Sequence, residues 1–116
     1  MLFASLSGCL LFAPPELIQL TPQEFHDATQ GVDVVLVDVH IPEQTHIEGT
    51  DALVPYNEIL DHLDEFPEDR SEPIYLYCRS GHMVNPASRD LFDEGYTTIY
   101  NLDGGTIAWE EASLPY

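Results

Sequence analysis

The fold is decided by a stretch in which an apolar run passes directly into a polar loop: Pro73-Ile74-Tyr75-Leu76-Tyr77-Cys78-Arg79-Ser80-Gly81-His82-Met83-Val84. Residues 74–77 predict a buried strand, and residues 86–94 predict the helix that follows the loop. A cysteine between the carboxyl end of a strand and the amino end of a helix is placed for thiolate chemistry, because loop N–H groups and the helix dipole favour an anion there. Cys78 is therefore the candidate catalytic nucleophile.

The residues that follow Cys78 support this interpretation. Arg79 adds a cation beside the thiol, and Gly81 reaches a backbone conformation that other residues adopt only with strain. A buried, inert core cysteine is the alternative, but it would have no need of the Arg-Ser-Gly that follows. The sequence favours a reactive thiol at this position.

The rest of the chain predicts an α/β domain. We expect strands at residues 17–20, 34–39, 52–54, 74–77 and 97–102. Helices are expected after Thr21 and Asn57 and at residues 86–94 and 106–112. Thr21, Pro22 and Glu24 form a capping-box signal, and Ile59, Leu60 and Leu63 should face inward. This alternation predicts a mostly parallel sheet of about five strands with helices on both faces.

Such a sheet brings distant segments together, because ligands bind at the carboxyl ends of parallel strands. Besides Cys78, the ends of two other predicted strands carry polar residues. The predicted supporting residues at these ends are Asp38, His40 and Asp103.

Composition limits the partners. The 116 residues make one domain, with a formal charge of −18, 21 acidic residues, three arginines and no lysine. Nucleic acid and anionic membrane surfaces are not expected to attract such a chain, because both need basic patches.

Cys9 and Cys78 do not make a disulfide framework, and no cysteine–histidine cluster has zinc spacing. His40 and His46 are expected to be ordinary loop histidines. We expect a monomer without metal or cofactor.

Residues 1–15 are expected to lie apart from the domain at residues 16–116. The first thirteen residues carry no charge, and Pro14-Pro15 follows them. Leu6-Ser7-Gly8-Cys9 resembles the lipobox of exported lipoproteins, whose cysteine is lipidated, although no Lys or Arg precedes it as in a signal peptide. An apolar N-terminal strand or a tail is the alternative. The lipobox slightly favours the cell envelope over the cytoplasm, with a lipid on Cys9 as the only membrane link.

Four blocks in order resemble the rhodanese-type sulfurtransferases. The loop at Cys78 is similar to the family's Cys-Arg-Ser-Gly-x-Arg-Ser, and residues 34–43 are similar to its strand followed by Asp-Val-Arg-x-Pro-Glu. Residues 46–56 resemble its His-Ile-Pro-Gly-Ala-Ile-Asn-Ile-Pro stretch, and residues 101–109 its Leu-x-Gly-Gly-x-x-Ala-Trp ending. The resemblance covers roughly residues 17 to 112.

The resemblance implies that a thiolate on Cys78 takes a sulfane sulfur from thiosulfate or a thiol persulfide or polysulfide. A persulfide would form there and pass its sulfur to cyanide, a small thiol or a protein thiol. The backbone amides of the binding loop would cradle this sulfur; its residues are Arg79, Ser80, Gly81, His82, Met83 and Val84.

Departures from the family pattern bear on the substrate. Met83 and Val84 stand where the family has Arg and Ser, and His40 replaces the Arg of Asp-Val-Arg. His40 can pair with Glu43 only when it is protonated or acts as a neutral donor. The loss of a cation from the loop favours a thiol-borne sulfur donor over thiosulfate.

Three other functions compete with sulfur transfer. Related phosphatases need an Arg six positions after the cysteine to clamp phosphate, and Val84 occupies that position here. A non-enzymatic interaction module on the same fold usually loses the cysteine, which this chain keeps. A redox-sensing role would cycle Cys78 through sulfenic acid or a mixed disulfide, with Cys9 or an external thiol as its partner.

Overall fold

A computed structural model describes residues 15–116. Cys9 and the rest of the lipobox-like segment lie outside the described residues, so the expectations for lipidation and for apolar packing of the N-terminal segment stay predictions. Within residues 15–116, no helix is both long and apolar enough to cross a membrane.

The described residues form one five-stranded sheet in which every neighbouring pair of strands is parallel. Its strands in spatial order are β1 (Leu17–Leu20), β5 (Ile99–Leu102), β4 (Ile74–Tyr77), β2 (Val35–Asp38) and β3 (Ala52–Leu53). Leu76 of β4 lies in register with both Val37 and Asn101. The carboxyl ends of β2, β4 and β5 therefore meet at one edge of the sheet, where the sequence predicts the site.

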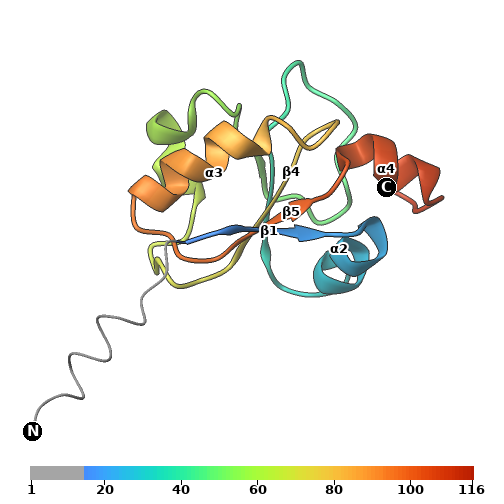
Figure 1. Cartoon of the computed structure of the whole chain (residues 1–116), viewed down its shortest axis with the longest axis horizontal. Helices are drawn as coiled ribbons and strands as arrows, with labels where there is room; N and C mark the ends of the chain where they lie inside the picture. Colours follow the sequence, from blue (N-terminus) through green and yellow to red (C-terminus); the bar gives the residue numbers. More distant parts are fainter. Residues whose placement is uncertain (1–14) are drawn as a thin grey trace, which may run out of the picture.

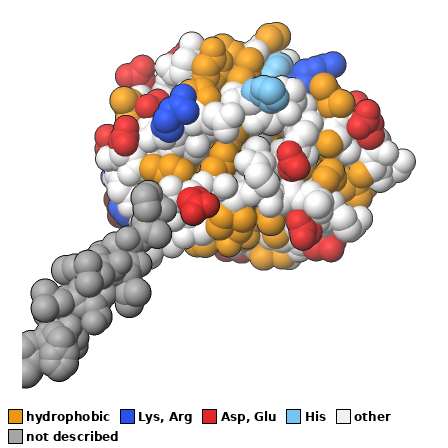
Figure 2. All heavy atoms as spheres, viewed as in Figure 1, with side chains coloured by type: hydrophobic (Ala, Val, Ile, Leu, Met, Phe, Trp, Pro, Cys, Tyr) orange, Lys and Arg blue, Asp and Glu red, His pale blue; other side chains and the backbone are white. Residues whose placement is uncertain are grey.

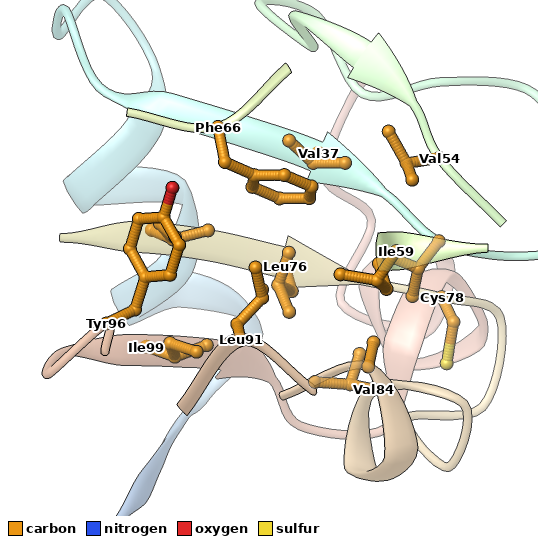
Figure 3. Close-up of a cluster of buried hydrophobic side chains, with 13 residues drawn as sticks. Val37, Val54, Ile59, Phe66, Leu76, Cys78, Val84, Leu91, Tyr96 and Ile99 are labelled. Carbon is orange, nitrogen blue, oxygen red and sulfur yellow. The ribbon is translucent and has the colours of Figure 1, made fainter. Parts of the chain in front are cut away.

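Helices cover both faces of the sheet (Figure 1). The helix α2 (Pro22–Thr29) and the helix α4 (Gly105–Glu111) pack on one face, where Phe25 and Trp109 are fully buried. The helix α3 (Val84–Asp93) and the 3₁₀ segment η1 (Ile59–Glu65) pack on the other. Figure 3 shows the second core, in which Cys78 lies among aliphatic side chains such as Val84 and Ile59. The predicted α/β fold is confirmed.

Local signals explain why the first helix begins where it does. The Thr21 hydroxyl accepts a hydrogen bond from the Glu24 N–H, and the Glu24 carboxylate accepts one from the Thr21 N–H over 2.9 Å. Two N–H groups at the helix start that would otherwise be unpaired are thus satisfied. The capping box predicted from the sequence is confirmed.

The segment after Asn57 differs from the prediction. It is a 3₁₀ helix whose capping position is Glu58, and neither Asn57 nor Glu58 caps it with a side chain. Ile59 is buried as expected, but Leu60 is 54% exposed, because the segment has 3₁₀ geometry rather than the 3.6-residue α-helical period. The inward placement of Leu60 was therefore wrong.

Other boundaries shift by one or two residues. The helix α3 begins at Val84 instead of Pro86, and α4 begins at Gly105 instead of Thr106. Strand β2 begins one residue later and ends one residue earlier than predicted, and β5 begins two residues later. The earlier start of α3 places its first turn directly after the loop that carries Cys78.

Candidate functional site

Cys78 follows the last residue of β4, and its side chain is fully buried. Leu76 and Cys78 point to the same face of the sheet because side chains alternate along a strand, so the thiol lies on the side covered by α3. The backbone N–H of Gly81 donates a hydrogen bond to the Cys78 sulfur over 3.0 Å. The loop therefore folds back over the sulfur, as a loop that stabilises a thiolate must.

Gly81 makes this return possible. Its φ of +100° lies in the left-handed region, and a Cβ there would come within 3.2 Å of the Gly104 nitrogen. Glycine is the residue that meets both demands without strain. The turn that brings the Gly81 N–H to the sulfur thus depends on glycine at this position.

Asn101 packs beneath the loop and supports it, although only Asp103 was predicted as a supporting residue at this strand end. It is 2% exposed at the carboxyl side of β5, and its Nδ2 donates to the Gly81 carbonyl over 3.4 Å and to Gln19 Oε1 over 2.9 Å. Its Oδ1 has no partner within residues 15–116. The sequence signal that could have identified Asn101 was a polar residue near the carboxyl end of a predicted buried strand.

The start of α4 holds the backbone of Cys78 from the other side. The Thr106 N–H donates to the Cys78 carbonyl over 3.0 Å, and the Ile107 N–H donates to the Arg79 carbonyl over 3.1 Å. This close approach needs Gly105, where a Cβ would lie 2.3 Å from the Arg79 carbonyl carbon. These two N–H groups at the start of α4 would otherwise be unpaired, and they hold the carbonyl groups of Cys78 and Arg79 in place.

Asp38 anchors residues 40–46, which we call the strap. This carboxylate is fully buried and accepts hydrogen bonds from the His40 N–H at 2.9 Å, from Gln44 Nε2 at 3.2 Å and from His46 Nδ1 at 2.9 Å. Gln44 Oε1 in turn accepts from the Thr106 hydroxyl over 2.9 Å. The strap is thus tied to α4, the helix that holds Cys78.

The roles of the two strap histidines differ from the prediction. Glu43 pairs with His46 Nε2 at 2.9 Å, whereas His40 Nδ1 lies 2.7 Å from the Pro42 carbonyl, so the His40–Glu43 pair that the sequence allowed does not form. His46 is not an ordinary loop histidine, because it joins Glu43 to the buried Asp38. Hydrogen bonds that the His46 ring donates, first to Glu43 and then to Asp38, raise the pKa of His46, although partial burial opposes them.

A cleft of about 320 Å³ opens between the strap, Arg79 and the carboxyl end of the chain. This size is within the range of small-molecule sites. Cys78 itself does not line the cleft, but its neighbour Arg79 does. The lining residues are His40, Pro42, Glu43, Gln44, Thr45, Arg79, Thr106, Glu110 and Tyr116.

The other predicted site residues around the thiol differ in how far they are exposed to solvent. Arg79, Ser80 and His82 are exposed, Met83 is half-buried and Val84 is fully buried in the core beside Cys78. Asp103 is exposed, and its N–H donates to the Leu20 carbonyl over 2.9 Å. Within residues 15–116, no group of three or more His, Cys, Asp or Glu residues could hold a metal ion.

Residues 21–112 match the family described as rhodanese-like domain. A sulfurtransferase of Allochromatium vinosum is 40% identical over 86 residues, which cover 72% of this chain and 78% of that protein. The thiosulfate sulfurtransferase GlpE of Pseudoalteromonas translucida is 34% identical over 83 residues, covering 69% of this chain and 76% of that one.

Structural similarity agrees with these matches. A rhodanese-like domain protein from Staphylococcus aureus superposes with a TM-score of 0.68 at 27% identity, covering 80% of this chain and 91% of that one. Some relatives are much longer proteins. The tRNA uridine(34) hydroxylase of Chlamydia pneumoniae is 26% identical over 110 residues, yet the chain spans only 34% of its length.

Proposed function

We propose that this chain, which belongs to the family of rhodanese-like domains, is a sulfurtransferase that carries a sulfane sulfur as a persulfide on Cys78. The observation that carries the proposal is the hydrogen bond of 3.0 Å from the Gly81 N–H to the Cys78 sulfur. A core cysteine has no need of a glycine turn at positive φ that aims a backbone donor at its sulfur. The names of the sulfurtransferase relatives agree with this chemistry.

The reaction has two displacements. In the first, the Cys78 thiolate attacks the outer sulfur of a donor, the sulfur–sulfur bond of the donor breaks, and the carrier leaves with the electron pair as sulfite or a thiolate. In the second, a nucleophilic acceptor attacks the outer sulfur of the Cys78 persulfide. The acceptor becomes thiocyanate or a persulfide, and Cys78 returns as a thiolate. No external oxidant or reductant is needed.

The site favours a donor whose sulfur is carried by a thiol. Thiosulfate is a small dianion, and Met83 supplies no cation where the family's loop usually has Arg. Acidic side chains are scattered over the face shown in Figure 2, and the formal charge of −18 opposes the approach of any dianion. A thiol persulfide brings less negative charge into the loop than thiosulfate does.

Parallel assays on the full chain test this function. One measures thiocyanate formed from thiosulfate and cyanide, and the other measures sulfur transfer from a glutathione persulfide to a thiol acceptor. We expect turnover with both donors and a higher kcat/KM for the persulfide, with no turnover by Cys78→Ser. A chain that oxidises at Cys78 but transfers sulfur from neither donor would instead be a redox-sensing module.

A further inference from the structure

The cleft between the strap and α4 does not belong to the sulfur-binding loop. It shares only Arg79 with that loop, and the other walls come from the strap, from Thr106 and Glu110 of α4, and from Tyr116. We propose that this cleft binds the charged amino-acid part of a small thiol that delivers or collects the sulfur. The thiol would be an amino acid or short peptide with both an ammonium and a carboxylate group. This inference rests on the proposed sulfurtransferase function.

The position of the cleft fits a carrier subsite. The Thr106 N–H is bonded to the Cys78 carbonyl, so the α4 wall of the cleft lies directly against the backbone of the reactive residue. His40 follows β2, which is paired with β4, and therefore lies at the same edge of the sheet as Cys78. The Cys78 sulfur lies on the α3 side of the same edge, so a ligand held in the cleft would extend its sulfur arm across this edge to reach the loop. Thiosulfate would leave a space of about 320 Å³ largely unfilled.

The charges of the cleft are mixed, and they match a zwitterion. Arg79 supplies a permanent cation that has no ion pair within the described residues, and it is free to receive a carboxylate. Glu110 supplies a carboxylate on another wall for an ammonium group, and Glu43, which also pairs with His46, supplies a second one. A ligand with a single charge would meet a repelling group in the same cleft.

Glu110 is held in place for this role. The Tyr116 hydroxyl donates a hydrogen bond to the Glu110 carboxylate. Burial first, and then the neighbouring Glu110, raise the pKa of Tyr116 to about 12, so the phenol keeps its proton at neutral pH. The carboxylate retains free acceptor positions, since one carboxylate can accept several hydrogen bonds.

The ligand class can be tested without any sulfur transfer, by titrating the full-length protein with thioethers that cannot donate sulfur. The series is S-methyl-L-cysteine, 3-(methylthio)propionate, 2-(methylthio)ethylamine and the neutral 2-(methylthio)ethanol. Amide chemical shifts in NMR spectra report both the site and the Kd. We expect shifts at His40, Thr45, Arg79 and Glu110, with S-methyl-L-cysteine bound at least about threefold more tightly than each singly charged analogue. Equal binding of the neutral thioether, or shifts outside the cleft, would overturn the proposal.

A matched pair of variants on α4 tests the ammonium contact. Glu110→Gln keeps an acceptor for Tyr116 but removes the charge, and should weaken S-methyl-L-cysteine roughly threefold. Glu111→Gln makes the same change of net charge at an exposed neighbour that does not line the cleft, and should leave the Kd unchanged. Equal weakening by both variants would contradict a local contact. If the wild type binds no thioether but still transfers sulfur, this inference fails and the proposed function stands.

Discussion

The backbone N–H of Gly81 points at the sulfur of Cys78 over 3.0 Å, and Gly81 reaches this position with a φ of +100°. A single turn that requires glycine thus couples the backbone geometry of the loop to the chemistry of the thiol. The sulfur would gain its extra atom within the same loop, where the Gly81 amide is already directed at it.

Gly81→Ala tests this coupling. An alanine at this φ costs about 1–2 kcal/mol, and its Cβ would press against the Gly104 nitrogen, so the loop should shift and persulfide formation should slow by about tenfold. Stopped-flow persulfide formation and thermal unfolding measure the two effects. Gly31→Ala is the control, because Gly31 also has a positive φ but no atom near its Cβ. Equal slowing in both variants would mean that the effect is general destabilisation.

Asn101→Ala tests the support beneath the loop. The change removes the donor to the Gly81 carbonyl and to Gln19, which should lower the free energy of unfolding by about 1–2 kcal/mol and slow persulfide formation. Gln19→Ala removes only the outer bond, so it should have the smaller effect on the rate. Urea unfolding and the rate of persulfide formation give both values. A larger rate effect from Gln19→Ala would contradict the role of Asn101.

Much of the fold was predictable because its signals are local. The capping box at Thr21 and the apolar run before Cys78 each specify an element without reference to the rest of the chain. The segment at Leu60 was not predictable in the same way, because its apolar spacing fits an α-helix while the chain adopts 3₁₀ geometry. Tertiary packing decides such short segments.

The candidate site also has a part that local sequence predicts and a part that depends on tertiary packing. Cys78 and Gly81 were identified from adjacent residues. Asn101 and the bridge from Asp38 to His46 depend on which strand ends meet, and their contacts join residues 20 and eight positions apart. The family resemblance suggested His40, which stands where the family has Arg, as a possible partner of Glu43. The buried Asp38 carboxylate instead draws in His46, since a buried charge needs donors.

The strap should loosen as the pH rises. The pKa of His46 is raised in the folded protein, so its contribution to stability is fully present below the pKa of a free histidine and is lost as the pH rises through the folded-state pKa. Urea midpoints of the wild type and His46→Gln should therefore differ more at about pH 6 than at about pH 9. A difference that stays constant or grows with pH would show that protonated His46 does not hold the strap.

Met83→Arg restores the cation that the loop lacks. We expect kcat/KM for thiosulfate to rise about tenfold, equivalent to about 1.4 kcal/mol from one added charge-assisted contact, with little change for a thiol-borne donor. Asn85→Arg adds the same charge at an exposed position in the first turn of α3 and serves as the control. Equal gains for both donors would mean that position 83 does not face the bound anion.

The most direct test is the intact mass of the full chain after incubation with a sulfane donor. The wild type should gain about 32 Da, the mass of one sulfur atom, and should lose it on addition of cyanide or a thiol. Cys78→Ser should gain nothing under the same conditions. A wild type that stays unmodified, or a Cys78→Ser variant that gains the same mass, would contradict a persulfide on Cys78.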